Sequence, residues 1–569
     1  MQNIHYHTDL CVVGGGLAGL CAAVSAARNG IKVVLMQDRP VLGGNASSEI
    51  RMWVCGAENT YDRETGILEE LFLENYYRNP NLSYSVWDSV LYGIAKQERN
   101  LVLLLNCSCM DAQMEGDRIT AVTGWQMTTE RRIQVTAKIF ADCSGDGILA
   151  PLTGAEFMLG REARSAFGES LSPEQADSKT MGQSCIMQLR EYSTKQEFIP
   201  PEWAYKYAEN DEMMARREHV LSKGQNFWWI EVGGIGDILH ETEENRDELL
   251  KIAFGIWDHI KNQGRHKDAE NWAIDWIGFL PGKRESRRFV GQYIMNQEDI
   301  ENGTSFEDAV AYGGWPLDDH HPEGIYYSGD GCTQIYVAKS YGIPYRSLVA
   351  KRIENLGFAG RNISVTHTAL SSTRVMATCA ILGQSLGTAA AMAVQHGCLL
   401  KEVDVHALQQ QLLYDDCYIP GIRREVSALT KAARTNAEIL RSGIDREADG
   451  TTCNQYIGGK NEKVYYRYTE PVYISEVRII FNSRLEREYD NMPASYPLVQ
   501  PDYKMPETLV KKFQLYIRTE EGTSLLYETD ANFKRMVKIP VNRMAEEVIL
   551  IPEETWGDEK IRIFAMDII

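Results

Sequence analysis

Residues 9–38 read DLCVVGGGLAGLCAAVSAARNGIKVVLMQD, and this stretch decides the fold of the chain around it. An apolar run ends in Gly14, Gly16 and Gly19, an alanine-rich segment follows, and a second apolar run begins after Gly30. This order predicts a strand, a tight turn, a helix and a second strand. In that context the three glycines permit the turn, the approach of backbone to a pyrophosphate, and close packing of helix on strand. The stretch therefore predicts a dinucleotide-binding unit with phosphates at the helix N-terminus.

The end of the second strand departs from the usual pattern. An acidic residue usually holds the ribose hydroxyls there, but this place falls on Gln37, with Asp38 next. Either side chain can hydrogen-bond a hydroxyl, and the sequence does not choose between them. The following residues, 39–57, read RPVLGGNASSEIRMWVCGA. Their small side chains predict a floor on which a flat ligand can lie.

Two later segments resemble parts of a cofactor site. Residues 133–147, IQVTAKIFADCSGDG, alternate as a strand does and end in a tight turn. Residues 355–397 contain a predicted strand that ends in Gly360-Arg361, followed by a long helix of small residues. A nicotinamide-binding domain would continue at once with further strand–helix units. The long separation of the segments therefore favours a flavin.

Four motifs give a specific resemblance: GGNASSE at 43–49, GKRESRR at 282–288, IPYRSL at 343–348, and AGRNIS…STRV…GQ..GTAAA at 359–390. On these residues the chain resembles the FAD-dependent oxidoreductases that share their cofactor domain with fumarate reductases and glutathione reductase. The resemblance spans most of residues 1–400. It implies an α/β fold, with a Rossmann-like FAD-binding domain and an inserted α+β substrate or cap domain.

The resemblance also implies roles for particular residues. Pyrophosphate would contact Gly14, Gly16, Gly19, Gly360 and Arg361. The adenosine ribose would contact Gln37, Asp38 or Arg39, with Asp142, Gly145 and Asp146 closing the adenine side. The ribityl chain and flavin would lie along Gly43, Gly44, Asn45 and Ser47. The pyrimidine edge would face Gly383, Gln384, Gly387 and Thr388, although close helix packing is an alternative for the two glycines.

FAD is expected to be bound non-covalently. Some relatives of fumarate reductase attach the flavin through a histidine after the second strand, and this chain has no histidine between His7 and His219. Cys55 could form a thioether, but a small buried cysteine is the favoured interpretation. The twelve cysteines include no CxxC pair, so no metal site is predicted.

The middle of the chain, residues 161–345, is predicted to cover the flavin and to bind substrate. It is rich in tryptophan, including the pair Trp228-Trp229, and indole faces suit a sugar ring. The alternative for any one of these indoles is a place in the core. The sequence therefore gives a carbohydrate as one candidate for the small-molecule substrate.

Candidate catalytic residues are a histidine near the pyrophosphate segment and polar groups of the cap. His367 could accept a hydroxyl proton while hydride leaves carbon for flavin; a structural hydrogen bond is the alternative. GKRESRR places Arg284, Arg287 and Arg288 close together, and one of them could bind a carboxylate or stabilise reduced flavin. Arg287 and Arg288 are the candidates named, and a salt-bridged element is the alternative. His320, in the sequence DDHH, is a further candidate acid or base.

The tail has a different pattern. Short alternating strands with Gly, Pro and Asn turns predict an antiparallel β-sandwich, and the tail resembles a discoidin-like, galactose-binding jelly roll. The predicted domains are 1–160 and 346–400 for the two parts of the FAD-binding domain, 161–345 for the cap, 401–449 for a helical connector, and 450–569 for the sandwich.

Composition limits the partners. With 59 basic and 79 acidic residues the net charge is -20, which argues against nucleic acid or an anionic membrane as the partner. No signal peptide or membrane span is predicted, and the scattered cysteines favour a reducing cytoplasm. The electron acceptor is not revealed, and a homo-oligomer is one open alternative.

Three functions are compatible with these features. The first is oxidation of an alcohol, on a sugar-like or other small polar substrate, by hydride transfer to FAD. The second is the reverse type of reaction, reduction of an activated double bond as in fumarate reductases. The third is a carbohydrate-binding or scaffold protein that holds FAD without turnover.

Overall fold

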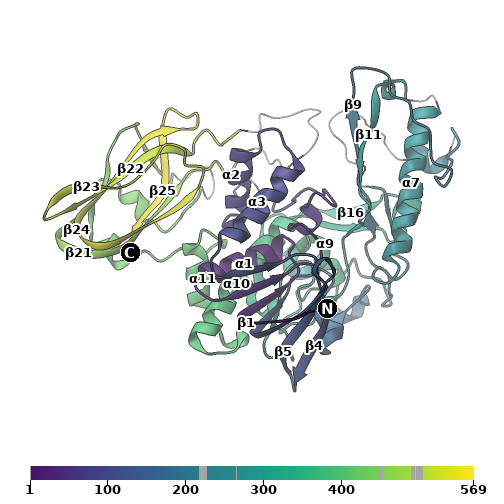
Figure 1. The fold of residues 1–569 in the computed structure, drawn as a ribbon, viewed down its shortest axis with the longest axis horizontal. Helices are drawn as coiled ribbons and strands as arrows, with labels where there is room; N and C mark the ends of the chain where they lie inside the picture. The colour runs from purple at the N-terminus through teal and green to yellow at the C-terminus, as the bar shows by residue number, and fades with distance from the viewer. Residues whose placement is uncertain are drawn as a thin grey trace. The chain divides into compact units, whose positions relative to one another are not determined.

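The chain forms two compact units (Figure 1). The computed structural model describes residues 2–59, 61–209, 211–216, 227, 229–263, 266–447, 450, 453–487, 494 and 504–569. Unit 1 comprises Met1–Ala57, Asn81–Leu408 and Asn491–Pro501, and unit 2 comprises Glu58–Pro80, Gln409–Asp490 and Asp502–Ile569.

Unit 1 is built on a sheet with the strand order β3-β2-β1-β6-β5-β4, in which β18 also pairs with β6. The bounds are β1 Gln2–Val13, β2 Val33–Met36, β3 Leu101–Leu104, β4 Cys107–Glu115, β5 Arg118–Gln126, β6 Arg131–Asp142 and β18 Leu356–Phe358. The pairs β1–β2, β2–β3, β1–β6 and β6–β18 are parallel, whereas β4 and β5 are antiparallel. Val13, Met36 and Phe358 therefore end neighbouring strands at one edge, where ligands of such sheets bind.

Helices α1 (Leu17–Arg28) and α10 (Met376–His396) pack against each other and against strands of this sheet (Figure 1). Their small side chains allow the close approach. In length and mean hydropathy, 1.4, α10 would also suit a membrane, which the sequence reasoning did not expect. However, 94% of its apolar window is buried inside the protein, as in a core helix. Helix α3 (Tyr84–Gln97) also contacts α1.

Part of the middle region has a core of its own. Short strand β8 (Gln183–Ser184) lies between β10 (Glu231–Val232) and β12 (Gly282–Lys283), and β9 (Met187–Glu191) pairs with β11 (Trp272–Ile277). Helix α7, Thr242–Asn262, contributes its apolar face to the same cluster. Trp257 and Trp272 are buried there and Trp229 packs against it, so these indoles are core residues. Trp228 lies outside the described residues.

Small hairpins complete unit 1. Strand β15 (Leu317–His320) pairs with β16 (Cys332–Ile335), and helix α9 (His367–Thr373) contacts β15. The remaining short elements are α4 Leu149–Thr153, β7 Phe157–Met158, α5 Arg164–Phe167, α6 Glu212–Arg216, β13 Arg288–Phe289, α8 Gln297–Glu301, β14 Ala309–Gly313 and β17 Tyr341–Pro344.

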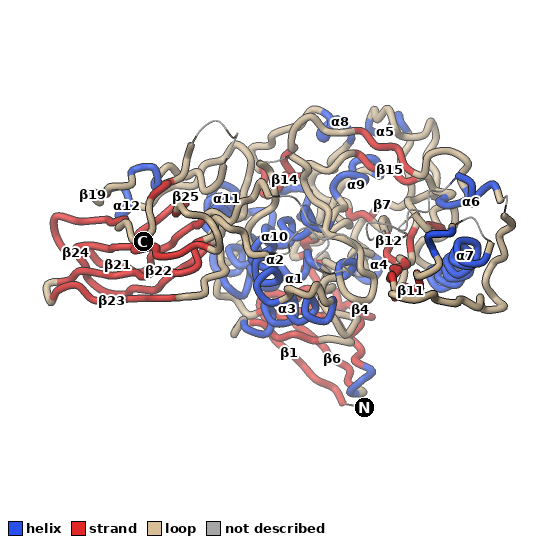
Figure 2. Tube along the Cα trace, turned by 90° about the horizontal axis from the view of Figure 1, so that it is seen from above, coloured by secondary structure: helices blue, strands red, loops and turns tan. Residues whose placement is uncertain are grey.

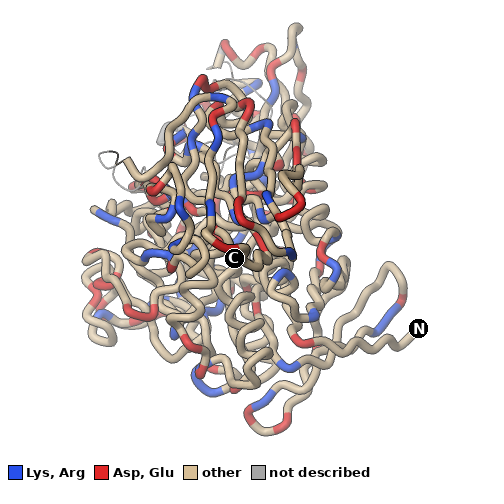
Figure 3. Tube along the Cα trace, turned by 90° about the vertical axis from the view of Figure 1, so that its left-hand side faces the viewer, with Lys and Arg blue, Asp and Glu red and all other residues tan. Residues whose placement is uncertain are grey.

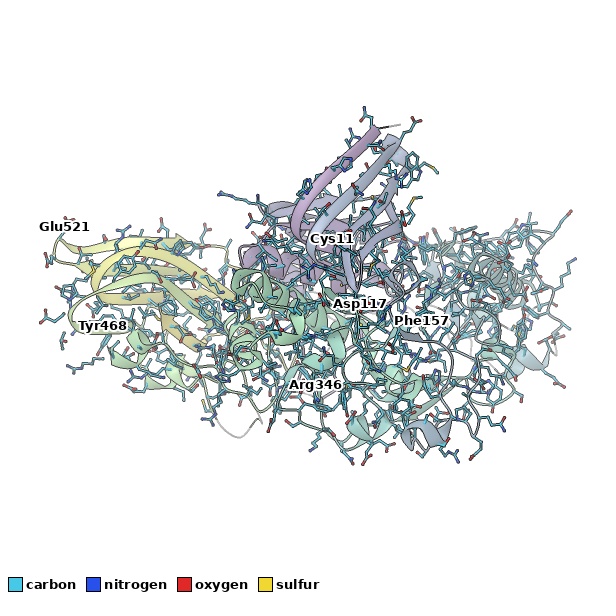
Figure 4. All side chains as sticks on the ribbon, turned by 90° about the horizontal axis from the view of Figure 1, so that it is seen from below. Cys11, Asp117, Phe157, Arg346, Tyr468 and Glu521 are labelled. Atoms are coloured by element: carbon cyan, nitrogen blue, oxygen red, sulfur yellow. The ribbon has the colours of Figure 1, made fainter. Side chains whose placement is uncertain are left out.

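Unit 2 contains one antiparallel sheet with the strand order β20-β25-β21-β24-β22-β23, and β19 also pairs with β21 (Figure 2). Its strands are β19 Arg434–Thr435, β20 Tyr456–Gly458, β21 Val464–Phe481, β22 Val510–Thr519, β23 Gly522–Thr529, β24 Met536–Thr555 and β25 Ile561–Ile568. Its helices include α2 Ile67–Arg78 and α12 Ala428–Ala432, and α11, Val405–Tyr414, crosses the boundary between the units. Glu521, labelled in Figure 4, lies in the turn between β22 and β23. The antiparallel character of the tail is as predicted, and jelly-roll topology stays a prediction.

The boundaries of the units differ from the predicted domains. Residues 58–80 were assigned to the FAD-binding domain, but they belong to unit 2, where Tyr77 of α2 stacks on Phe533 at 4.6 Å. The middle region, 161–345, clusters with the FAD-binding segments in unit 1. Sequence periodicity could not detect the first difference because a helix pattern does not state which sheet the helix packs on. Acidic and basic residues are interspersed along the chain in Figure 3.

Candidate active site

A cavity of about 740 Å³ opens in unit 1 at the carboxyl ends of the parallel strands. Its wall includes Val13 and Met36 at the ends of β1 and β2, Cys143 just after β6, and Gly360 just after β18. The volume lies in the range of cofactor and substrate pockets. Twelve residues predicted to contact the cofactor line it: Gly14, Gly16, Gln37, Asp38, Arg39, Gly43, Gly44, Asn45, Gly145, Asp146, Gly360 and Arg361.

Two glycine turns meet on this wall. The Gly43 amide donates to the Gly15 carbonyl at 2.8 Å, and Gly16 forms a β-bridge with Gly43. Gly14 has φ +101°, and a Cβ there would lie 2.5 Å from the backbone of Cys143. At Gly16 a Cβ would meet only Gly44, at 3.9 Å, so this backbone has room for a ligand. The α1 N-terminus carries no side-chain cap, which leaves its amides available to phosphate.

The two candidates for the ribose differ in their surroundings. The Gln37 side chain is buried: its Oε1 accepts from the Gly15 amide at 2.6 Å and its Nε2 donates to the Val41 carbonyl at 3.1 Å. Gln37 thus holds the glycine turn. Asp38 lines the same cavity with its side chain 60% exposed. Asp38 is therefore the side chain better placed to accept a hydrogen bond from a ribose hydroxyl.

Charged groups along the wall fit a bound dinucleotide. Asp146 pairs with Arg361 at 2.7 Å and with Lys283 at 2.9 Å. Burial would raise the pKa of Asp146, but the two cations outweigh it and hold the pKa well below its usual range. The Arg361 Nε is buried, and within the described part of the chain it has no hydrogen-bond partner. The same is true of Arg39 Nη1 and Glu49 Oε2, which lie 3.5 Å apart. These residues can hold FAD, and Arg361 at the phosphates stays a prediction.

Three other predicted residues act behind the wall. A Cβ on Gly19 would overlap the Gly14 carbonyl, so this glycine serves packing. The Ser47 hydroxyl donates to the Gly44 carbonyl at 2.7 Å. Asp142 accepts from the amides of Ser144 and Leu149, at 3.0 and 2.8 Å, and fixes the turn after β6. These residues position the wall and do not line it.

The prediction for α10 needs correction. A Cβ on Gly383 or Gly387 would overlap the carbonyl of Ala18 or Ala22 on α1, so both glycines serve close helix packing. The Thr388 hydroxyl lies 2.7 Å from that of Ser25, again between the two helices. Gln384 is buried and, like the other three, is not among the residues that line the cavity. A spacing of four places residues on one helix face but does not say which neighbour that face meets.

The arginine run also differs from prediction. Arg288 is fully buried and pairs with Glu162 at 3.0 Å. Arg287 donates to the Asp146 carbonyl at 3.2 Å, and its guanidinium lies over Phe157, which is labelled in Figure 4. Neither lines the cavity, whereas Arg284 of the same motif does. Arg287 and Arg288 therefore do not face the cavity as predicted, and Arg284, the third arginine of the motif, is the one on its wall.

His367 is not on the wall either. It begins α9, where its Nδ1 lies 2.9 Å from Glu285 and its Nε2 lies 3.1 Å from Asp319. Burial would lower the pKa of His367, but the two carboxylates outweigh it and raise the pKa to about 10. Its ring lies in a buried ion cluster that does not reach the cavity, so His367 is not placed to accept a substrate proton. The structural alternative describes it.

His320 is the predicted catalytic residue that does line the cavity. Its Nδ1 lies 2.8 Å from Glu231 Oε2 and its Nε2 lies 3.3 Å from Asp318 Oδ2. Burial would raise the pKa of Asp318, but the bond to His320 and the charge of Arg374 hold it well below its usual range. Burial would also raise the pKa of Glu231, but Arg284 and His320 outweigh it and lower that pKa. His320 is thus held between two ionised carboxylates.

Arg374 and Gln334 line the cavity but were not predicted as site residues. For Arg374 the available signal was its place in the STRV motif, whereas Gln334 lies in none of the motifs. Asp318, Trp53 and Trp315 also line the cavity. Tertiary contacts bring these separated segments together. In the described residues, no group of three or more His, Cys, Asp or Glu side chains has the arrangement of a metal site.

With this geometry established, comparison with known proteins identifies the class. The model of the family described as FAD dependent oxidoreductase matches residues 9–412. Because this is more than half of the 569 residues, the chain belongs to that family. It is an FAD-dependent oxidoreductase, and the cavity described above fits its cofactor, FAD.

Individual relatives are similar over short segments or at low identity. Sarcosine oxidase subunit alpha from Corynebacterium sp. (strain U-96) is 52% identical over 43 residues, 8% of this chain and 4% of that protein. Fumarate reductase (cytochrome) from Shewanella frigidimarina is 52% identical over 42 residues, 7% of each. The chain thus matches less than a tenth of the length of these curated relatives.

Solved structures are similarly distant. A variant of E. coli quinol fumarate reductase shares 13% identity over 73% of this chain and 74% of that chain, with TM-score 0.27. A family 32 carbohydrate-binding module from Streptococcus pneumoniae EndoD shares 16% identity over 25% of this chain and 99% of that chain, with TM-score 0.20. None of these matches assigns a substrate.

Proposed function

We propose that this protein oxidises an alcohol carbon of a small polar, sugar-like substrate by hydride transfer to non-covalently bound FAD. The observation that carries the proposal is the position of His320. It lies on the wall of the cofactor cavity, and its Nδ1 is held by Glu231 at 2.8 Å. An oxidised alcohol must lose a hydroxyl proton as well as a hydride, and a held imidazole is suited to take that proton.

The two carboxylate contacts of His320 have different roles. Glu231 holds the Nδ1 side and stabilises the charge that appears when the ring takes up a proton, as a buried carboxylate does for a catalytic histidine. The Nε2 contact with Asp318 is longer, 3.3 Å. In the form of the ring that has no proton on Nε2, a substrate hydroxyl entering beside Asp318 can replace this contact and donate to Nε2. Asp318 then stabilises the resulting imidazolium.

Residues on both sides of this point serve binding. The backbone of Gly14 and Gly16, with Arg361 and Asp38, would hold the dinucleotide part of FAD. Bound FAD supplies the two-electron acceptor for the hydride. The wall also combines the indoles of Trp53 and Trp315 with polar groups, among them Asn45, Ser184 and Gln334. Flat apolar faces next to hydrogen-bonding groups suit a polyhydroxylated substrate.

The test is anaerobic mixing of the yellow, FAD-loaded protein with sugars, glycosides, polyols and sugar acids, followed at the flavin absorbance band. We expect bleaching by at least one alcohol, and recolouring when an electron acceptor is added. Oxidation of pre-reduced protein by an unsaturated acid, without bleaching by any alcohol, would favour the reductase alternative. If no compound changes the flavin absorbance, only the scaffold alternative would remain.

A further inference from the structure

We propose that the substrate carries a carboxylate group next to the oxidised hydroxyl, and that Arg374 binds this carboxylate. The inference rests on the proposed function, because it names the substrate class of the same cavity. It starts from a guanidinium that is only partly used by the protein.

Arg374 lines the cavity and is held from one side. Its Nη2 donates to the carbonyl and to Oδ2 of Asp318, both at 3.1 Å. Its side chain is 12% exposed. Its other terminal nitrogen, Nη1, makes no hydrogen bond to any described residue, and it is not among the buried polar atoms that lack a partner. An anchored guanidinium with an open terminal nitrogen is a ready donor to an incoming carboxylate.

Further positively charged or partly charged donors lie near Arg374 on the wall of the cavity. Arg284 is a second guanidinium on the wall, paired with Glu231 at 3.3 Å and with the Ser184 hydroxyl at 2.9 Å. Burial lowers the pKa of Arg284, and the charge of Glu231 only partly offsets this lowering. Val375 and Met376, at the uncapped N-terminus of α10, line the same wall, and the positive end of a 21-residue helix adds to the field. Beside these two arginines and the helix N-terminus the lining carboxylate is Asp318. The other lining carboxylates, Asp38, Glu49 and Asp146, pair with Arg39, Lys283 or Arg361.

The charged groups around Arg374 suit a ligand group with one negative charge better than a group with two. Glu231 pairs with Arg284 and Asp318 pairs with Arg374, so each arginine is already opposed by one carboxylate. A singly charged carboxylate bound at Nη1 adds one anion to a cluster with positive donors on its surface. A phosphate dianion would place two negative charges beside Asp318, at a greater electrostatic cost. The group is therefore a carboxylate rather than a phosphate.

A shared atom limits the distance between carboxylate and hydroxyl. Arg374 Nη2 and His320 Nε2 contact the same oxygen, Asp318 Oδ2, at 3.1 and 3.3 Å. A molecule that reaches both residues must carry its carboxylate close to the hydroxyl that is oxidised. This describes a hydroxy acid of the sugar-acid type.

The reaction then balances without a further reactant. The hydroxyl O–H bond breaks and its proton goes to His320. The C–H bond breaks and its electron pair leaves as hydride to FAD, while a C=O bond forms. The product is a keto acid whose carboxylate is unchanged.

The experiment compares wild type with Arg374→Met and Arg374→Lys, and uses Arg346→Met as the matched control. Arg346 is labelled in Figure 4, pairs with Asp308 at 2.9 Å, and does not line the cavity. Each FAD-loaded protein is titrated in a calorimeter with propanoate, a carboxylate without a hydroxyl, and with D-gluconate, D-glucitol and glucose 6-phosphate. Flavin absorbance under anaerobic conditions is followed separately.

We expect gluconate to bind more tightly than glucitol or the phosphate. Affinity for gluconate and propanoate should fall by about 10- to 100-fold in Arg374→Met, less in Arg374→Lys, and not in Arg346→Met. Equal binding of gluconate and glucitol, tighter binding of the phosphate, no carboxylate binding, or an unchanged affinity in Arg374→Met would overturn the inference.

The two proposals fail in different ways. Carboxylate binding that depends on Arg374, with no bleaching by any alcohol, supports the carboxylate site and contradicts the oxidation. Bleaching by neutral polyols that is no weaker than bleaching by sugar acids supports the oxidation and contradicts the carboxylate site.

Discussion

Two buried histidines in this protein each lie between two carboxylates, but they differ in whether they reach the cofactor cavity. His320 lies between Glu231 and Asp318, and His367 lies between Glu285 and Asp319. Their exposed fractions are 5% and 2%, so burial does not separate them. Only His320 lines the cofactor cavity.

One short strand, β15, places the contacts of the two histidines on opposite faces. Asp318 and His320 are two residues apart on β15, so their side chains share a face, whereas Asp319 points to the other face. That other face carries the contact with His367. Two carboxylates around a histidine can therefore form either a reactive site or a structural ion cluster, depending on whether the histidine reaches the cavity.

The largest expected effect is on the chemistry of the two histidines. His320→Asn should slow flavin reduction by an active substrate by about 100- to 10,000-fold, because the proton acceptor is lost. His367→Asn should change the rate only a few-fold, because its ring contacts no cavity. Stopped-flow absorbance on FAD-loaded variants measures both. A reversed order of the two effects would break the comparison.

Stability should respond in the opposite sense. His367→Gln removes the cation between Glu285 and Asp319, leaving a buried carboxylate with fewer partners, and should lower the free energy of unfolding by about 3 kcal/mol. The measurement is urea unfolding at pH 7, with fluorescence as the signal. His320→Gln serves as the matched variant, and an equal loss in both would show that the clusters are structurally equivalent.

The pH dependence of stability should carry the signature of His367. Its pKa is about 10 in the folded protein and 6.5 ordinarily. Its stabilisation is therefore fully present below pH 6.5 and is lost as the pH rises towards 10, by up to about 1.4 kcal/mol per pH unit. Unfolding free energies of wild type and His367→Gln between pH 7 and 9.5 should converge. Parallel curves would contradict the assignment of this proton.

The smallest effect is expected at the residue between Asp318 and His320. Asp319→Asn keeps a hydrogen-bond acceptor near His367 but removes a charge, and its side chain is 25% exposed. The cost should be about 1 kcal/mol of unfolding free energy, with flavin reduction unchanged. Asp318→Asn is the paired variant, in which a loss of reduction rate is expected. Indistinguishable rates in the two variants would remove the distinction between the faces of β15.

The sequence predicted most reliably those residues whose backbone conformation requires a particular residue type. Gly14 needs a positive φ, Gly43 adopts φ +102°, and both lie where the pattern placed the cofactor. It failed for Gly383 and Gly387, because small residues serve a ligand and a neighbouring helix equally well. It also chose His367 over His320, since nearness in sequence to Arg361 does not determine which way a side chain faces.

By itself the sequence determined an FAD-binding α/β unit and an antiparallel tail. Strand alternation, glycine spacing and helix periodicity are local properties, so they can be read along the chain. The charged groups that surround the proposed substrate could be identified only from the tertiary structure. Glu231 meets His320 across 89 residues, and Arg374 meets Asp318 across 56. Contacts at such separations depend on how all the intervening segments pack, and no local pattern encodes them.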